Sequence, residues 1–355
     1  MSDDNYGASP CPLANRPAAP IVGRTPMIRH IIRHRPLLIG CGVTFILLLD
    51  ASNQLEVPMR HVPGEVYDRY LSTLRADDPP ARLLEEAKAG NTQAQYIYAL
   101  RHTRYAPTDL QINPDPAVAF EWMSKAAENR HPRAMAVLAL YYFNGIGTAK
   151  DEAKSREWAQ KAAEKGQPMG IRLLGEIRAA EASRLEHQFK QQNLTKPETN
   201  QEFQAARKLM QARRNELRKE SYLEIERAAK MGDSAALRML GKAYEEGHPG
   251  FTQNFRLAID YYTQAALKRD TVAMQLLAEH YECGTTTVVN LASAYAWRLV
   301  IYELSGEDND RAYLGELRKR MGLSEILAGQ EQAGVALKQL PSENDAALAR
   351  LAQSR

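Results

Sequence analysis

The sequence of 355 residues predicts an all-α protein in which pairs of helices stack into a superhelical solenoid. The first observation is a stretch that occurs twice: residues 122–145 read WMSKAAENRHPRAMAVLALYYFNG, and residues 261–284 read YYTQAALKRDTVAMQLLAEHYECG. The second is that related copies accompany them, most at a spacing of 36 or 37 residues. The third is that one copy lacks its final glycine, which predicts a long helical hairpin inserted in the array.

The N-terminal region predicts a targeting segment ahead of the array. Residues 1–35 are a tail that is proline-rich up to Pro26, typical of disorder, and that ends in a basic flank, MIRHIIRHR at residues 27–35. Residues 36–49, PLLIGCGVTFILLL, are uncharged and apolar. A basic flank before an apolar run indicates a signal sequence or a signal anchor. Because the arginines precede the run, the positive-inside rule places the N-terminus in the cytoplasm and the rest of the chain outside it.

The fate of this segment has several alternatives. A helix over residues 36–49 spans about 21 Å, which is short for a ~30 Å hydrocarbon core and suits a cleaved signal of a periplasmic protein. Leu49-Asp50-Ala51 is a poor cleavage site, however, so we favour an uncleaved single-pass anchor in the inner membrane. Lipidation of Cys41 is disfavoured, because eight more uncharged residues follow it. Since MIRHIIRHRP resembles a complete n-region, we expect Met27 to be the true start, which an intact-mass measurement would decide.

The predicted repeat array occupies residues 81–340, after a linker at residues 50–80 and before a C-terminal tail at residues 341–355. Each unit is expected to hold two helices, the first ending near an Ala-Ala pair and the second at a Tyr-x-x-Gly sequence. The glycine supplies the left-handed cap that ends a helix, and small residues in register allow neighbouring helices to approach closely. Three tryptophans that share one column of the repeat, Trp122, Trp158 and Trp297, are expected to pack between units.

These residues resemble the SLR family, the Sel-one-like repeats. The match is best over residues 117–166, AVAFEWMSKAAENRHPRAMAVLALYYFNGIGTAKDEAKSREWAQKAAEKG, where residues 144–151 carry the family's NGxGxxKD loop. The resemblance implies a right-handed superhelix of paired antiparallel helices over most of residues 81–340. It also implies an adaptor role in the assembly of membrane complexes. Tetratricopeptide repeats proper are disfavoured by the longer period and the glycine-rich loop.

The third copy departs from this pattern. It has Arg178 and Glu181 where the other copies have tyrosine and glycine, so its helix is expected to run on to about Asn193. The next helix is expected over about residues 198–230, and the extra residues, about 180–217, should form an antiparallel hairpin. Four apolar side chains are expected to pin it: Phe189, Phe203, Met210 and Leu217.

Charge and motifs exclude several functions. A net charge of +3 is too small to indicate nucleic-acid binding, and the basic run at residues 204–219 is expected to be a solvated face of the hairpin. GIGTAK at residues 145–150 lacks the GK[ST] ending of a phosphate loop, and no HExxH, GxSxG or Ser-x-x-Lys sequence occurs. We therefore expect no catalytic residue, cofactor or metal.

The predicted function is a non-enzymatic interaction scaffold of the bacterial cell envelope, with the repeat domain in the periplasm. Its partner is expected to be another protein or, alternatively, an envelope polysaccharide, held on a concave surface formed by the first helices of the units. Four polar positions are candidate contacts on that surface: Glu121, Lys125, Lys161 and Gln264. The alternatives are a peptidoglycan- or polysaccharide-acting envelope enzyme, an exopolysaccharide-assembly scaffold, and a stalk that spaces the hairpin from the membrane.

Overall fold

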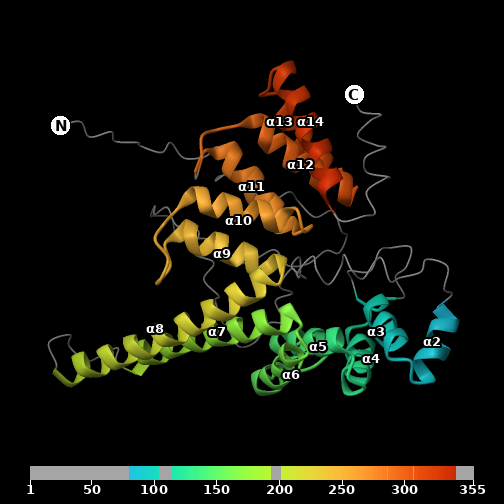
Figure 1. Ribbon diagram of the computed structural model, residues 1–355, viewed down its shortest axis with the longest axis vertical. Coiled ribbons are helices and arrows are strands. Elements are labelled where there is room, and N and C mark those ends of the chain that lie inside the picture. Colours follow the sequence, from blue (N-terminus) through green and yellow to red (C-terminus); the bar gives the residue numbers. More distant parts are fainter. Residues whose placement is uncertain (1–79, 104–112, 193–200, 286, 307, 341–355) are drawn as a thin grey trace, which may run out of the picture. The chain divides into compact units, whose positions relative to one another are not determined.

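The structure is a computed structural model that describes residues 80–103, 113–192, 201–285, 287–306 and 308–340. The chain divides into two compact units, residues 1–60 and 61–355, and every described residue belongs to the second. The predicted tail, apolar run and C-terminal tail lie outside these residues. The described residues form thirteen helices and no strand, which confirms the all-α prediction (Figure 1). Within them, no helix combines the length and apolar character that crossing a membrane requires.

The helices follow one another in the order that the repeat predicts. Their bounds are α2 Pro80–Lys88, α3 Thr92–Arg101, α4 Pro116–Glu128, α5 Pro132–Asn144, α6 Glu152–Glu164, α7 Pro168–Gln192, α8 Gln201–Lys230, α9 Ser234–Glu246, α10 Phe255–Ala266, α11 Thr271–Cys283, α12 Leu291–Ser305, α13 Asp308–Arg318 and α14 Leu323–Gln339. From α2 to α12 each helix packs chiefly on its neighbours in the sequence, and both α13 and α14 pack on α12. This sequence of local contacts is that of a repeat solenoid.

Caps define the limits of the helices. Asp115, Asp151 and Asp270 precede α4, α6 and α11, and the side chain of each accepts a hydrogen bond from a backbone N–H of the first turn. At the other end, α5, α9 and α11 stop at glycines with φ of 75°, 65° and 66°. These glycines are the ones in the Tyr-x-x-Gly sequences, so the predicted left-handed caps are confirmed.

The small residues of the second helices lie where successive units touch. A Cβ added to Gly175 of α7 would lie 2.8 Å from the carbonyl oxygen of Ser221 in α8, and one added to Gly241 of α9 would lie 2.7 Å from the ring of Tyr262 in α10. At the equivalent position in α5, the carbonyl oxygen of Ala139 accepts a hydrogen bond of 2.8 Å from the hydroxyl of Ser155 in α6. The repeat therefore requires a small residue at the position of Ala139, Gly175 and Gly241, because the next helix lies directly against it.

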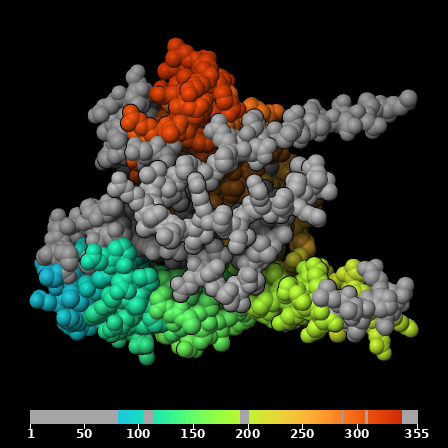
Figure 2. Space-filling view, turned by 180° about the vertical axis from the view of Figure 1, so that it is seen from behind, coloured from blue at the N-terminus to red at the C-terminus, as the bar shows by residue number. Residues whose placement is uncertain are grey.

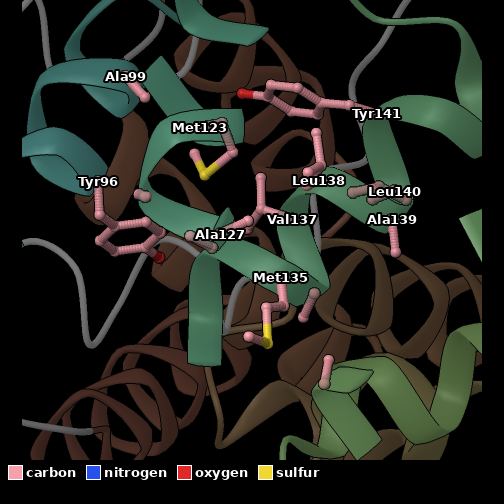
Figure 3. Close-up of a cluster of buried hydrophobic side chains, with 14 of the residues drawn as sticks. Tyr96, Ala99, Met123, Ala127, Met135, Val137, Leu138, Ala139, Leu140 and Tyr141 are labelled. Carbon is pink, nitrogen blue, oxygen red and sulfur yellow. The ribbon is translucent and has the colours of Figure 1, made fainter. Parts of the chain in front are cut away.

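Buried side chains form the core between the helices. Figure 3 shows Tyr96 and Ala99 of α3, Met123 and Ala127 of α4, and several residues of α5 gathered into one cluster. Met123 and Ala127 are completely buried. A second cluster extends from residue 171 in α7 to residue 340, after α14. Both clusters receive residues from several consecutive helices, so no helix pair has a core of its own.

The predicted hairpin is present as α7 and α8, which run side by side (Figure 1). Their far ends extend beyond the shorter helices (Figure 2). The first ends at Gln192 and the second begins at Gln201, close to the expected limits. The rings of Phe189 and Phe203 stack with their centroids 5.6 Å apart, and Leu217 is buried. Met210 is half-buried. The stack of Phe189 on Phe203 and the burial of Leu217 agree with the predicted packing of the hairpin, whereas a role for Met210 stays a prediction.

The two unusual residues of the third copy form ion pairs at the base of the hairpin. Arg178 of α7 binds Glu220 of α8 at 3.0 Å and also contacts Glu224. Glu181 of α7 lies 3.2 Å from Arg156 of α6. Arg178 and Glu181 stand where the other copies have the tyrosine and glycine that end the helix. They therefore allow α7 to continue, and they also link it to α8 and α6 by ion pairs.

Candidate interaction surface

A Glu-Trp-x-x-Lys sequence on α4 combines three side chains into one surface feature. The ammonium of Lys125 lies 2.6 Å from a carboxylate oxygen of Glu121 and 4.1 Å from the centroid of the Trp122 ring. The carboxylate is exposed, whereas the ring is largely buried and meets Tyr98 of α3 edge-on, at a centroid distance of 5.3 Å. The indole therefore packs between helices, as predicted for Trp122, while the lysine covers its remaining open side.

The next unit repeats this arrangement on α6. The ammonium of Lys161 lies 2.6 Å from Glu157 and 4.2 Å from the ring of Trp158. Exposed pairs four residues apart contribute only about 0.3–0.5 kcal/mol each to stability. Their main physical effect is to hold each lysine beside a carboxylate in a fixed position, so that the first helices present ordered polar groups to solvent.

The four candidate contact residues are accessible, but they do not form one cluster. Glu121 and Lys125 bind each other, whereas Lys161 binds Glu157, a residue that the sequence prediction omitted. The signal for Glu157 was available, because glutamate stands four residues before lysine in both EWMSK and EWAQK. Gln264 is exposed on α10, where the neighbouring column holds Tyr261 in place of tryptophan. That these positions line a concave surface stays a prediction.

Other polar groups lie between units, where they are buried or half-buried and pair with each other. Arg172 of α7 lies 2.9 Å from Asp233, which caps α9, and Arg238 of α9 lies 3.0 Å from Asp270, which caps α11. Burial alone would lower the pKa of Arg172, but Asp233 and Glu176 raise it above its usual value. An arginine of one second helix thus fixes the cap of the next one.

The equivalent position of the first unit uses an aromatic residue instead. Tyr96 of α3 stacks on His131, the cap of α5, at a centroid distance of 4.6 Å. The Ala134 N–H donates to Nδ1 of His131 at 3.2 Å, and Nε2 lies 2.9 Å from Oε1 of Gln93. Burial, assisted by the positive charge of Arg133, lowers the pKa of His131 from 6.5 to about 4. The ring is therefore neutral at pH 7, as its capping role requires.

A cluster of glutamate, tyrosine and histidine joins α9, α10 and α11. The Tyr262 hydroxyl donates to Glu245 at 2.5 Å, and Nε2 of His280 lies 3.5 Å from the same carboxylate. Burial raises the pKa of Glu245, but the hydrogen bonds from His280 and Tyr262 outweigh it and hold that pKa below its usual value. Tyr262 and His280 are both buried and Glu245 is half-buried, so the cluster joins the three helices.

The described part of the chain offers no group of three or more histidine, cysteine, aspartate or glutamate side chains placed to bind a metal ion.

Comparison with known families decides what kind of array this is. Residues 92–131, 132–167, 234–270 and 271–297 each match the family model of the Sel1 repeat. The chain carries four Sel1 repeats. The resemblance to Sel-one-like repeats is thereby confirmed, and the gap between the second and third matches, residues 168–233, contains the whole of α7 and α8. The hairpin is an insertion into the Sel1 array.

Three solved structures are similar to this Sel1 repeat chain. A protective antigen of uropathogenic Escherichia coli that displays an SLR fold is 19% identical over 82% of this chain and 62% of its own, with a TM-score of 0.36. A Sel1 repeat protein from Oxalobacter formigenes is 22% identical over 67% and 59%, with a TM-score of 0.43. A putative Sel1 repeat protein from Klebsiella pneumoniae subsp. pneumoniae is 20% identical over 68% and 100%, with a TM-score of 0.37.

The chain spans about three fifths of the length of the first two of these proteins. No curated protein matches it. Sel1 repeat proteins are generally scaffolds for protein interactions and typically are not enzymes.

Proposed function

We propose that this Sel1 repeat chain is a non-enzymatic adaptor of the bacterial cell envelope, whose repeat domain binds another protein in the periplasm. The observation that carries the proposal is the repeated Glu-Trp-x-x-Lys feature, in which two successive first helices hold exposed charges in the same geometry. A regular series of ordered polar groups suits recognition of an extended partner surface. The buried polar clusters, by contrast, are occupied in joining helices.

Export is the second part of the proposal, and it rests on the sequence of residues 27–49, in which a basic stretch precedes an apolar run. We infer that this segment places the repeat domain outside the cytoplasm, as a single-pass anchor of the inner membrane or, after cleavage, as a leader. Alkaline phosphatase fused after Leu340 should be active in intact cells, because that enzyme needs an oxidising compartment. An inactive fusion that is nevertheless produced in normal amounts would contradict export.

Partner binding is tested by photo-crosslinking in cells, with a photoreactive amino acid placed singly at Lys125, Lys161 or Gln264. Lys242 on α9 and Lys338 on α14 are matched controls, since both are exposed lysines outside the first helices. The proposal predicts the same protein adduct from the first-helix positions and none from the controls. Equal adducts from all positions, or no reproducible adduct, would contradict it. A carbohydrate adduct would redirect it to an envelope polysaccharide.

The enzyme alternative has a separate readout. Purified chain incubated with peptidoglycan sacculi should release no muropeptide if the protein is an adaptor, and release that depends on the folded chain would support an envelope enzyme instead.

A further inference from the structure

The side of α8 that faces away from α7 forms a surface that the array does not use. We define the α8 outer face as the ten exposed residues that lie within about 100° of arc on this helix: Gln201, Ala205, Lys208, Leu209, Ala212, Glu216, Lys219, Leu223, Arg227 and Lys230. Leu209 and Leu223 are 74% and 58% exposed, which makes them two of the most exposed large apolar residues of the described chain. The opposite side of α8 carries Leu217 and Phe203, which pack toward α7.

Three lysines form a straight row along this face. Lys208, Lys219 and Lys230 are separated by eleven residues each, which is three helical turns or about 16.5 Å. None of the three has a carboxylate partner within the described residues. Arg214 and Arg218, on the inner side of the same helix, are paired with Glu186 of α7 at 3.1 and 3.9 Å. The positive charge is therefore neutralised inside the hairpin and left open on its outer face.

An apolar row lies beside the lysines with the spacing of a helix–helix seam. Ala205, Leu209 and Ala212 follow one another at intervals of four and three residues, and Leu223 continues the same series two heptads after Leu209. Ala205 and Ala212 lie on either side of Leu209, and such small residues allow a second helix to approach closely. The polar positions of the series are Glu216 and Lys219, and Glu216 is bound to Arg213 at 2.8 Å.

We propose that the α8 outer face binds an acidic amphipathic helix of the partner protein, which lays an apolar row against Leu209 and Leu223 and places carboxylates opposite the row of lysines. The proposal rests on the adaptor function and names the chemistry of the partner. Charge complementarity selects an acidic segment, and the four-and-three spacing selects a helix, because a helical partner meets this seam at every turn.

The same face is poorly suited to a membrane surface. Helices that lie in the membrane interface bury a broad face of large apolar side chains, whereas this one exposes only two leucines and two alanines. It also carries the carboxylate of Glu216 between its apolar residues, which anionic headgroups would repel.

The experiment measures binding of the full chain to a fluorescein-labelled synthetic helix by anisotropy. The probe carries three glutamates at the eleven-residue spacing beside leucines spaced by four and three residues. A second peptide has the same composition in a scrambled order. We expect the scrambled peptide to bind at least about fivefold more weakly, because its carboxylates surround the helix and cannot face the lysines together. Equal binding of the two peptides would overturn the proposal.

The triple variant Lys208→Glu, Lys219→Glu, Lys230→Glu should weaken binding of the ordered peptide by about tenfold or more. The control Lys88→Glu, Lys165→Glu, Lys338→Glu makes the same change in net charge at exposed lysines outside this face, and should leave binding within about twofold. An equal loss in both variants would show a general charge effect and refute a defined site.

Two further arms keep the result decisive. Leu209→Gln with Leu223→Gln alters no charge and should also weaken binding, with the thermal unfolding curve unchanged because both side chains are exposed. Vesicles of phosphatidylglycerol should not displace the peptide; displacement that requires the three lysines would assign the face to a lipid surface and overturn the proposal. The adaptor function survives such a failure if the crosslinks from Lys125 and Lys161 are found, so the two ideas are tested independently.

Discussion

The Sel1 units and the α7–α8 hairpin belong to one chain but are held by different kinds of contact. Between units, glycines such as Gly241 lie directly against the next helix, and charged groups such as Arg172 and Asp233 are paired in full burial. In the hairpin, the main polar contacts are partly exposed ion pairs, such as those of Arg178 and Glu186, and the rings of Phe189 and Phe203 stack on each other.

This difference indicates which part of the molecule can accept substitutions without loss of stability. A charge buried without its partner costs about 3–5 kcal/mol, whereas an exposed pair contributes about 0–1 kcal/mol. The contacts between units therefore leave little freedom for substitution. We expect the hairpin to tolerate new surface residues, which leaves the α8 outer face free to evolve toward recognition.

The largest expected effect follows from removing the buried arginine. Arg172→Ala leaves Asp233 buried without its partner and should lower the free energy of unfolding by about 3–5 kcal/mol, measured by urea denaturation monitored by circular dichroism. The double variant Arg172→Met, Asp233→Asn keeps a capping side chain and removes both charges, so its loss should be much smaller. If Arg172→Ala lowers the free energy of unfolding no more than the double variant does, the unpaired buried charge of Asp233 is not the cause of the loss.

Close packing between units gives the next largest effect. In Gly241→Ala the new Cβ would lie 2.7 Å from the ring of Tyr262 and 3.2 Å from the carbonyl oxygen of Ala258, so the helices must separate. The expected loss is about 1–3 kcal/mol in the same measurement. Gly315→Ala is the matched control, because nothing lies within 4 Å of a Cβ at that helical position, and it should be neutral or slightly stabilising. Similar losses at both sites would argue against close packing at this column.

The histidine cap of α5 predicts a dependence on pH. Its pKa is about 4 in the folded chain and near 6.5 when unfolded, so between these values the unfolded chain binds more protons. Stability should be complete above pH 6.5 and fall as the pH is lowered toward 4, by about 1–2 kcal/mol after allowance for the partial exposure of the ring. His131→Asn keeps a capping acceptor without this titration, and its profile should be flatter over the same range. Identical profiles would exclude His131 as the source.

The smallest effect is expected at the base of the hairpin. Arg178→Met removes the partly exposed pairs with Glu220 and Glu224 and should cost only about 0.5–1 kcal/mol. The difference from the unmodified chain should shrink further at high salt, because screening weakens such pairs. A loss as large as that of Arg172→Ala would abolish the contrast between the two regions.

Much of the fold could be predicted because the residues that pack between units recur at the same positions in each copy of the repeat. Alanine pairs, Tyr-x-x-Gly stops and the missing glycine at Glu181 predicted the helix pairs and the hairpin almost to the residue. The coupling of Arg172 to Asp233 could not be predicted, since the two residues lie in different units and the equivalent positions hold tyrosine and histidine in an earlier one. The ion pair of Lys161 with Glu157 follows the i,i+4 spacing that the sequence already shows, whereas whether these residues contact a partner stays a prediction.

Hydrogen exchange of the native full chain, resolved to short segments by mass spectrometry, tests most directly whether the hairpin is independent of the array. The account predicts that amides of residues 182–192 and 201–214 exchange at least roughly a hundredfold faster than those of α5 and α9, because the far half of the hairpin opens without disturbing the units. Equal protection in the hairpin and the array would contradict it, since the hairpin would then be part of the cooperative core and not a projection free to bind a partner.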